Sequence, residues 1–253
     1  MINTPEYLII AHRGESFDAP ENTLAAINLA WKRKAKSVEI DIQLTNDNEI
    51  VVIHDYDTLR ISGKKKTINN SSLKELKLLD AGLYKGEEWR NERIPTLNEV
   101  FKTVPSLGKL IIEIKSDEDI IEKLKYELSG SNLKVSQIEI IAFNANTLSK
   151  AKKMMPEYKM LWLLDLDYSW PHWLIWMRKQ KIVKKIKKLH LDGVNIWAGK
   201  LLTKDFVEYF KNAGLLVYTW TVNDPFKAQQ LIEFGIDGIT TDKAKWMTEQ
   251  LAK

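Results

Sequence analysis

The chain has 253 residues, no cysteine and a formal net charge of +4 at pH 7. The lack of cysteine excludes disulfides, a thiolate nucleophile and a zinc site with sulfur ligands. The small net charge gives no reason to expect a nucleic-acid partner. Neither a leader pattern nor a run of 18 apolar residues is visible, so we expect a cytoplasmic protein without a membrane-spanning helix.

Short apolar runs that predict strands alternate with segments whose apolar residues recur every three or four positions, as in helices. The predicted strands are residues 7–11, 37–44, 50–54, 109–114, 137–142, 159–164, 193–196, 216–221 and 238–240. The predicted helices are residues 23–34, 97–103, 119–129, 147–154, 204–213, 225–234 and 243–252. Asn22 and Thr203 precede two of these helices and are expected to be N-caps.

This alternation predicts a parallel sheet with helices outside it. About eight strand–helix units in ~250 residues fit a TIM (β/α)8 barrel, and a doubly wound open sheet is the alternative. Residues 56–95 break the rhythm, with turn residues and one short helix pattern at 72–79. We therefore expect one α/β barrel over residues 1–253, with residues 56–95 as a small insertion after the second strand region.

Charged side chains cluster where the predicted strands end, and barrel strands bring their C-terminal ends to one mouth. Glu39 and Asp41 lie two residues apart, so they share one face of a strand, and Glu113 and Lys115 repeat this spacing. Carboxylates on a buried strand face are costly unless something positive lies between them. The residues expected at the mouth are His12, Arg13, Glu39, Asp41, His54, Glu113, Lys115 and Trp220.

These residue types predict phosphoryl-ester chemistry. Three carboxylates without thiolates suit one divalent cation with oxygen ligands, Ca²⁺ or Mg²⁺. Arg13 and Lys115 suit a bound phosphate, and Trp220 is expected to contact the substrate. His12 and His54 suit proton transfer near neutral pH, one as acid and one as base. Together these groups indicate hydrolysis of a phosphate ester.

Eight motifs, in this order and spacing, resemble those of the glycerophosphodiester phosphodiesterase family. They are HRG at 12–14, PENT at 20–23, EIDIQLTND at 39–47, VVIHD at 51–55, RIPTLNEV at 93–100, IEIK at 112–115, WTVN at 220–223 and GIDGITTD at 235–242. The resemblance implies a TIM barrel with a small insertion. It also implies a small-molecule glycerophosphodiester substrate, cleaved to sn-glycerol 3-phosphate and an alcohol.

The same resemblance implies roles for single residues. Glu39, Asp41 and Glu113 would be the metal ligands, and His12 and His54 the catalytic acid/base pair. Three positions depart from the usual pattern, namely Asn48 in place of glycine, Ile61 in place of threonine after Arg60, and Ala142 where serine is common. These departures bear on substrate preference and leave the ligands and the histidines intact. Within the motifs, Glu21 is expected to be structural and Asp242 to be a helix cap.

Several alternatives stay open from the sequence. The attacking oxygen belongs either to a metal-bound water or to the neighbouring glycerol hydroxyl, which would give a cyclic phosphate first. A phospholipase-type barrel or a barrel that only binds a phosphorylated metabolite would keep the fold and change the function. In residues 161–190, Trp170, Trp173 and Trp176 precede seven lysines and arginines. This segment predicts either an outer helix with a solvated basic face or peripheral membrane contact through residues 168–190 and a lysophospholipase D activity.

Overall fold

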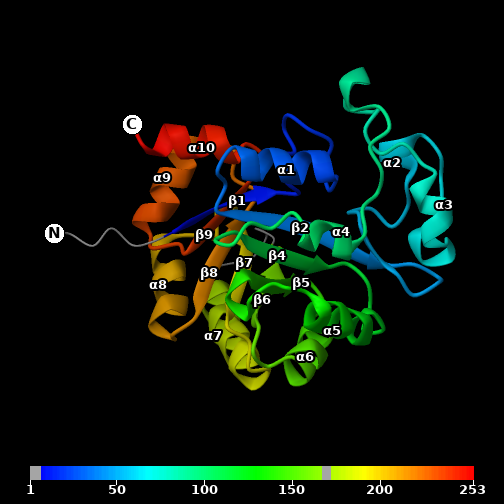
Figure 1. The fold of residues 1–253 in the computed structure, drawn as a ribbon. Helices are drawn as coiled ribbons and strands as arrows, with labels where there is room; N and C mark the ends of the chain where they lie inside the picture. Colours follow the sequence, from blue (N-terminus) through cyan, green and yellow to red (C-terminus); the bar gives the residue numbers. More distant parts are fainter. Residues whose placement is uncertain (1–6, 167–171) are drawn as a thin grey trace.

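The computed structural model describes residues 7–166 and 172–253, and its centre is a closed barrel (Figure 1). The eight barrel strands run parallel, and β1 pairs with both β2 and β9, which closes the barrel. This confirms the predicted TIM barrel and excludes the open sheet. The strands are β1 (Leu8–His12), β2 (Ser37–Leu44), β4 (Lys109–Ile114), β5 (Ile138–Ala142), β6 (Lys159–Leu164), β7 (Gly193–Trp197), β8 (Leu216–Trp220) and β9 (Gly238–Thr241).

The ninth strand, β3 (Ile50–Val52), lies outside the barrel circuit. It pairs antiparallel with β2, so the expectation that residues 50–54 form one more parallel strand is wrong. A tight turn connects the two strands, in which the N–H of Asn48 donates to the carbonyl of Thr45 at 3.2 Å. Asn48 has a φ of 60°, a left-handed conformation that glycine adopts without strain. His54 therefore reaches the mouth from the end of a hairpin.

Helices cover the outside of the barrel, and their side chains interlock with the outer faces of the strands in one large apolar core. Thr203 caps α8 as expected, since its hydroxyl accepts the N–H of Phe206 at 3.3 Å. The expectation that Asn22 caps a helix is wrong, because the N-cap of α1 is Thr23. The covering helices are α1 (Leu24–Lys32), α4 (Leu97–Phe101), α5 (Ile120–Gly130), α6 (Ala145–Met154), α7 (His172–Lys188), α8 (Lys204–Asn212), α9 (Pro225–Glu233) and α10 (Ala244–Leu251), and the short 3-10 turn η3 (Val135–Gln137) precedes β5.

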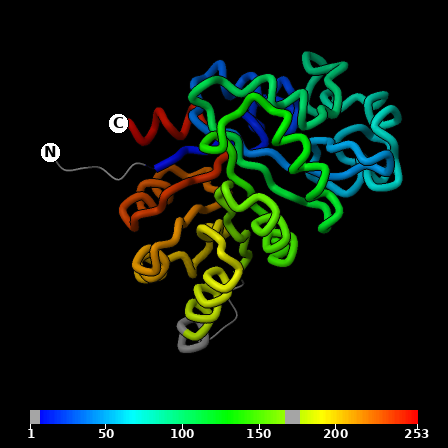
Figure 2. Tube along the Cα trace, turned by 60° about the horizontal axis from the view of Figure 1, so that its bottom comes forward, coloured from blue at the N-terminus to red at the C-terminus, as the bar shows by residue number. Residues whose placement is uncertain are grey.

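The segment expected as an insertion, residues 56–95, lies to one side of the barrel, away from both chain ends (Figures 1 and 2). It carries α2 (Leu59–Ser62), η1 (Ile68–Asn70), α3 (Leu73–Lys77) and η2 (Glu87–Trp89). Its apolar side chains pack with β3 in a small cluster separate from the main core. The hairpin therefore gives this segment an apolar surface to fold against, next to His54.

The inside of the barrel is filled by a layer of apolar side chains, Ile10, Ile111, Ile141, Leu161, Leu163 and Tyr218. Successive side chains of a strand point to opposite faces of the sheet. The residue two positions after a member of this layer therefore also points into the barrel. On β1 and β4 those residues are His12 and Glu113. The apolar layer is thus the floor on which the charged groups of the mouth lie.

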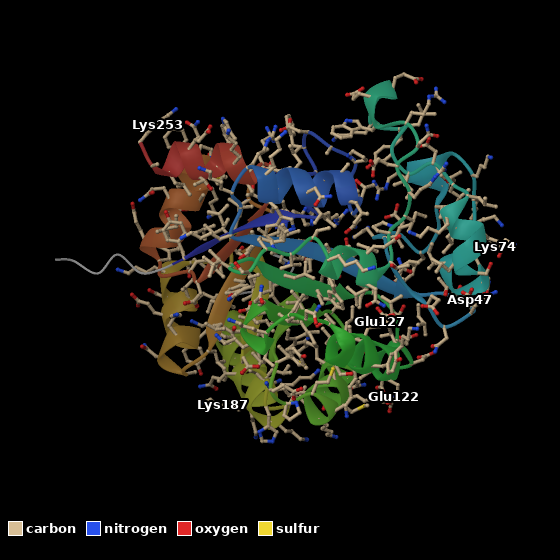
Figure 3. The ribbon with its side chains drawn as sticks, viewed as in Figure 1. Asp47, Lys74, Glu122, Glu127, Lys187 and Lys253 are labelled. Carbon is tan, nitrogen blue, oxygen red and sulfur yellow. The ribbon has the colours of Figure 1, made fainter. Side chains whose placement is uncertain are left out.

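The outer surface of the covering helices carries charge, as at Glu122 on α5 and Lys187 on α7 (Figure 3). On α7, Ile182, Val183 and Ile186 are buried against the barrel, whereas Lys184, Lys187 and Lys188 are exposed. Trp170 and the side chains of Trp173 and Trp176 lie outside the described residues. Among the residues described, no helix is long and apolar enough to cross a membrane.

Candidate active site

The HRG stretch at the end of β1 makes the turn that begins the site. Arg13 has a φ of 55°, a conformation that L-residues rarely adopt. Two hydrogen bonds hold it there: its N–H donates to Glu39 Oε2 at 3.0 Å, and its carbonyl accepts the N–H of Asn22 at 3.0 Å. Gly14 follows with a φ of 84°, and a Cβ there would lie 2.5 Å from the backbone of Ala26. Glycine is therefore required where the chain passes α1.

Strand register brings the three expected metal ligands together. Glu39 on β2 lies beside His12 of β1, and Asp41 lies beside Glu113 of β4. One carboxylate oxygen from each of Glu39, Asp41 and Glu113 lies within 4.8 Å of the other two. All three side chains are buried. The two-residue spacing seen in the sequence thus becomes one acidic cluster.

The donor set of this cluster fits a divalent cation. Glu39 Oε1 and Asp41 Oδ1 are buried and accept no hydrogen bond from the described residues. Burial and the neighbouring carboxylates raise the pKa of Glu39 well above its usual range, and burial together with Asp41 raises that of Glu113 to about 7. Buried carboxylates that repel one another in this way are stabilised by a bound cation with oxygen ligands.

Asn22, which was expected to cap a helix, instead holds one of the carboxylates. Its Nδ2 donates to Asp41 Oδ2 at 2.8 Å, and its Oδ1 accepts the N–H of Asp41 at 3.2 Å. Because Thr23 caps the helix, the side chain of Asn22 is available for this second task. A hydrogen-bonded partner of this kind fixes the orientation of a metal-binding carboxylate.

Two cationic side chains border the acidic cluster. Arg13 Nε lies 3.1 Å from Asp41 Oδ2, and Lys115 Nζ lies 3.0 Å from Glu113 Oε1. Burial alone would lower the pKa values of both side chains, but the carboxylates around them raise both. Arg13 and Lys115 are therefore charged, and an anionic group that approaches the cluster meets positive charge at the ends of two strands, β1 and β4.

Each histidine of the site pairs with an aspartate. His12 Nδ1 lies 2.6 Å from Asp242 Oδ1, and His54 Nδ1 lies 2.7 Å from Asp55 Oδ1. The expectation that Asp242 caps a helix is wrong, because α10 begins after Lys243 without a side-chain cap. The histidine hydrogen bond holds the pKa of Asp242 at about 2 in spite of its burial.

Aromatic side chains form one wall of the mouth. Trp220, at the end of β8, packs edge-to-face against Phe143, which follows β5, with ring centroids 5.7 Å apart. Lys115 Nζ lies 5.9 Å from the centre of the Phe143 ring. Phe143 was not predicted as a site residue, although it lies two positions after Ile141 of the interior layer and on the same strand face.

Comparison with known proteins supports one family over nearly the whole chain. The family model described as "Glycerophosphoryl diester phosphodiesterase family" matches residues 12–245. The chain belongs to this family. A glycerophosphodiester phosphodiesterase of Caldanaerobacter subterraneus is 35% identical over 251 residues, which cover 97% of this chain and 98% of that protein.

A solved structure agrees with this assignment. A phosphodiesterase of Oleispira antarctica, in complex with the product sn-glycerol-3-phosphate, is 30% identical, with a TM-score of 0.86 and 97% of each chain covered. A human lysophospholipase D is 26% identical, over 92% of this chain and 82% of its own length. As a glycerophosphodiester phosphodiesterase, the chain is a phosphoric diester hydrolase, which confirms the family and the reaction class expected from its motifs.

Proposed function

We propose that this phosphodiesterase releases sn-glycerol 3-phosphate and an alcohol from glycerophosphodiesters, with a divalent cation at the acidic cluster and two histidines in proton transfer. The observation that carries the proposal is the convergence of three kinds of group at one mouth. Three carboxylates lie within 4.8 Å of one another, two cations border them, and each of two histidines is held by an aspartate.

The residues suited to hold the cation are Glu39, Asp41 and Glu113, which together supply only oxygen ligands. A bound Ca²⁺ or Mg²⁺ would supply positive charge next to the phosphate. Arg13 and Lys115 would bind the same phosphate from the protein side. In the transition state more negative charge lies on the phosphoryl oxygens than in the bound substrate. The two cations lower the activation barrier because they attract this transition state more strongly than the substrate.

The contacts of His54 favour a role as general base. An ammonium group can only donate hydrogen bonds, and Lys115 Nζ lies 3.2 Å from His54 Nε2. The ring proton of His54 then lies on Nδ1, facing Asp55, and Nε2 is the unprotonated nitrogen. Burial lowers the pKa of His54, which favours this neutral form. His54 is thus prepared to take the proton of the attacking oxygen.

His12 is left with the opposite role. Its Nδ1 faces the carboxylate of Asp242, which stabilises an imidazolium. In the proposed reaction His12 Nε2 donates its proton to the oxygen of the departing alcohol as the bond from phosphorus to that oxygen breaks. The attacking oxygen forms the new bond to phosphorus and gives its proton to His54. Trp220 and Phe143 would contact the carbon skeleton of the substrate.

The first experiment measures release of sn-glycerol 3-phosphate from glycerophosphocholine with Ca²⁺, with Mg²⁺ and with EDTA. We expect release that depends on a divalent cation and is lost in His12→Ala. Release that continues in EDTA would contradict the role of the cation. Equal release by His12→Ala and the wild type would contradict the role of the histidine.

Cleavage of a lysophospholipid is the second candidate, favoured by the similarity to a human lysophospholipase D and by the exposed lysines of α7. Lysophosphatidylcholine presented in anionic vesicles tests it. Choline release from this substrate at a higher kcat/KM than from glycerophosphocholine would favour the lipid. A Lys184→Glu/Lys187→Glu variant would then lose activity on vesicles and keep activity on the soluble diester.

A further inference from the structure

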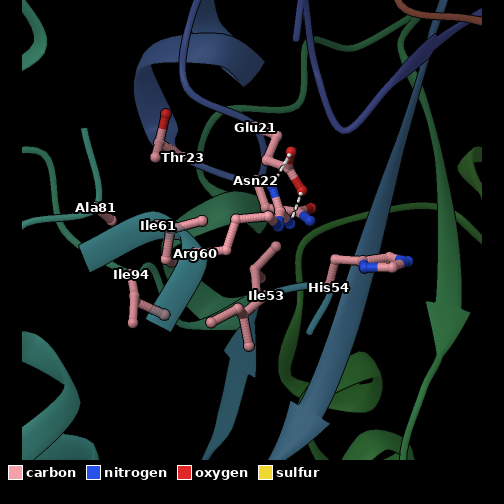
Figure 4. A pocket seen from close by; sticks show the side chains of 10 residues that line it. Glu21, Asn22, Thr23, Ile53, His54, Arg60, Ile61, Ala81 and Ile94 are labelled. Carbon is pink, nitrogen blue, oxygen red and sulfur yellow. Dashed lines mark hydrogen bonds and ion pairs between the residues drawn. The ribbon is translucent and has the colours of Figure 1, made fainter. Parts of the chain in front are cut away.

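Arg60, on α2 of the insertion, bridges two carboxylates that come from different parts of the mouth. Its Nε donates to Asp55 Oδ2 at 2.6 Å. Its Nη1 and Nη2 donate to Glu21 Oε2 and Oε1 at 2.9 and 2.8 Å (Figure 4). Asp55 follows the β3 hairpin, whereas Glu21 lies in the loop between β1 and α1. One guanidinium therefore joins the insertion to two separate segments of the site.

Each of these carboxylates also holds a group that the proposed reaction uses. Asp55 divides its oxygens, with Oδ2 on Arg60 and Oδ1 on His54 Nδ1 at 2.7 Å. Glu21 Oε1 accepts from Arg13 Nη1 at 2.7 Å as well as from Arg60. A shift of Arg60 would thus change the position of the histidine and of the phosphate-binding arginine together.

Both carboxylates are ionised, which keeps these contacts strong. Burial alone would raise the pKa of Glu21, but hydrogen bonds and charge from Arg60 and Arg13 lower it to about 2. Arg60 and His54 lower the pKa of Asp55 to about 2 in the same way. Charge-assisted hydrogen bonds between guanidinium and carboxylate groups fix geometry as well as adding stability.

We propose that Arg60 is a positioning residue for the hydrolysis, which holds His54 through Asp55 and Arg13 through Glu21. The insertion then contributes to the catalytic site through this side chain. The inference rests on the proposed function, because it takes His54 and Arg13 as groups that act on the substrate.

Arg90, also in the insertion, provides a matched control. Its Nε and Nη2 donate to Glu87 at 2.8 and 2.7 Å, an ion pair on the surface of the insertion. Arg60 and Arg90 are similarly exposed, at 45% and 51% of the side chain. Arg90→Gln removes only an exposed ion pair, so we expect it to keep the wild-type Tm within about 2 °C. Arg60→Gln leaves Glu21, whose side chain is 17% exposed, with one cationic partner fewer, so we expect its Tm to fall by about 2–8 °C. Both variants are therefore assayed well below their own Tm, where the remaining difference between them reports catalysis.

The test measures kcat, KM and Tm with glycerophosphocholine at saturating cation. We expect Arg60→Gln to lower kcat by about tenfold or more and to raise KM by about threefold or more, with Arg90→Gln unchanged. Asp55→Asn should reproduce the loss in kcat alone, and Glu21→Gln the rise in KM. Because Arg60 acts on His54 through Asp55, the two substitutions remove the same effect. The double variant Arg60→Gln/Asp55→Asn should therefore have a kcat no lower than that of the less active single variant.

Three results would overturn the proposal. In the first, Arg60→Gln matches Arg90→Gln in both constants. In the second, the losses in kcat of Arg60→Gln and Asp55→Asn multiply in the double variant. In the third, kcat falls only in proportion to the folded fraction. If Arg60→Gln does not fold, Arg60→Lys replaces it, and it should show the same split between kcat and KM with smaller changes.

A spectroscopic measurement separates failure of this inference from failure of the proposed function. The chain has four histidines, so their side-chain ¹⁵N signals can be assigned by substitution. We expect the signals of His54 to shift in Arg60→Gln and to stay in place in Arg90→Gln, with no substrate present. Unchanged His54 signals would overturn the positioning role. A wild-type enzyme that does not cleave glycerophosphocholine would instead contradict the proposed function.

Discussion

His12 Nδ1 and Asp242 Oδ1 lie 2.6 Å apart, although 230 residues separate them in the sequence. The contact exists because β1 and β9 are neighbours where the barrel closes. Asn223, in the segment that follows β8, supports it by donating to Asp242 Oδ2 at 2.6 Å and accepting the N–H of Asp242 at 3.0 Å. Closure of the barrel therefore fixes the orientation of His12.

Replacement of Asp242 tests this relationship. We expect Asp242→Asn to lower kcat for glycerophosphodiester hydrolysis by about 10- to 100-fold with little change in KM, because the amide cannot stabilise the imidazolium of His12. Steady-state release of sn-glycerol 3-phosphate measures both constants. Asp205→Asn, at an exposed position in the first turn of α8, is the control and should keep wild-type values. A kcat within twofold of the control would exclude a catalytic effect of the Asp242 charge.

The histidines themselves should matter more than their aspartate partners. We expect His12→Ala and His54→Ala each to lower kcat at least ~100-fold, the usual scale for loss of a general acid or base. His190→Ala serves as control, since His190 is an exposed residue after α7. A near-normal kcat in His12→Ala or in His54→Ala would remove that histidine from the proposed mechanism.

Removal of the cation should affect stability as well as activity. Because Glu39 Oε1 and Asp41 Oδ1 are buried without hydrogen-bond partners among the described residues, we expect Ca²⁺ or Mg²⁺ to raise Tm and EDTA to reverse the rise. Glu113→Ala should require at least about tenfold more cation for half of the Tm shift, whereas Glu122→Ala, exposed on α5, should titrate like the wild type. An unchanged titration of Glu113→Ala would contradict its role as a ligand.

The acidic cluster could be predicted from sequence because strand geometry is regular. Residues two apart share a face, so Glu39 and Asp41 had to point the same way, and the parallel register then placed Glu113 next to Asp41. His12 and His54 could likewise be placed at the mouth, since both follow apolar runs. These predictions needed only local periodicity and the rule that barrel strands end at one face.

The contacts around the cluster depend on tertiary structure that no local pattern encodes. Asp242 and Asn22 both had the sequence context of helix caps, and only the three-dimensional arrangement shows that they bind His12 and Asp41. The antiparallel β3 could have been found, because Asn48 and the polar residues before it form a turn that joins two apolar runs. The composition of an apolar run alone does not show whether the strand is parallel or antiparallel to its neighbour.

Glu127 gives a pH-dependent prediction outside the site. It is buried on α5, its Oε1 lies 3.6 Å from Lys123 Nζ, and Lys123 Nζ also lies 3.0 Å from Glu49 Oε2 (Figure 3 shows Glu127). Burial raises the pKa of Glu127 from 4.5 to about 7. The folded state then binds this proton more tightly than the unfolded chain. The resulting stability is complete below pH 4.5 and is lost as the pH rises through about 7.

Glu127→Gln removes this titration and leaves Lys123 paired with Glu49. We expect the variant to gain stability relative to the wild type between pH 5 and pH 8, by on the order of 1–3 kcal/mol in the free energy of unfolding. Urea unfolding of both proteins at the two pH values measures the difference, and groups that titrate equally in both proteins cancel. Glu122→Gln, exposed on the same helix, should show no such change. A difference between Glu127→Gln and the wild type that is the same at both pH values would mean that Glu127 is already ionised at pH 5, and its burial would then not control its charge.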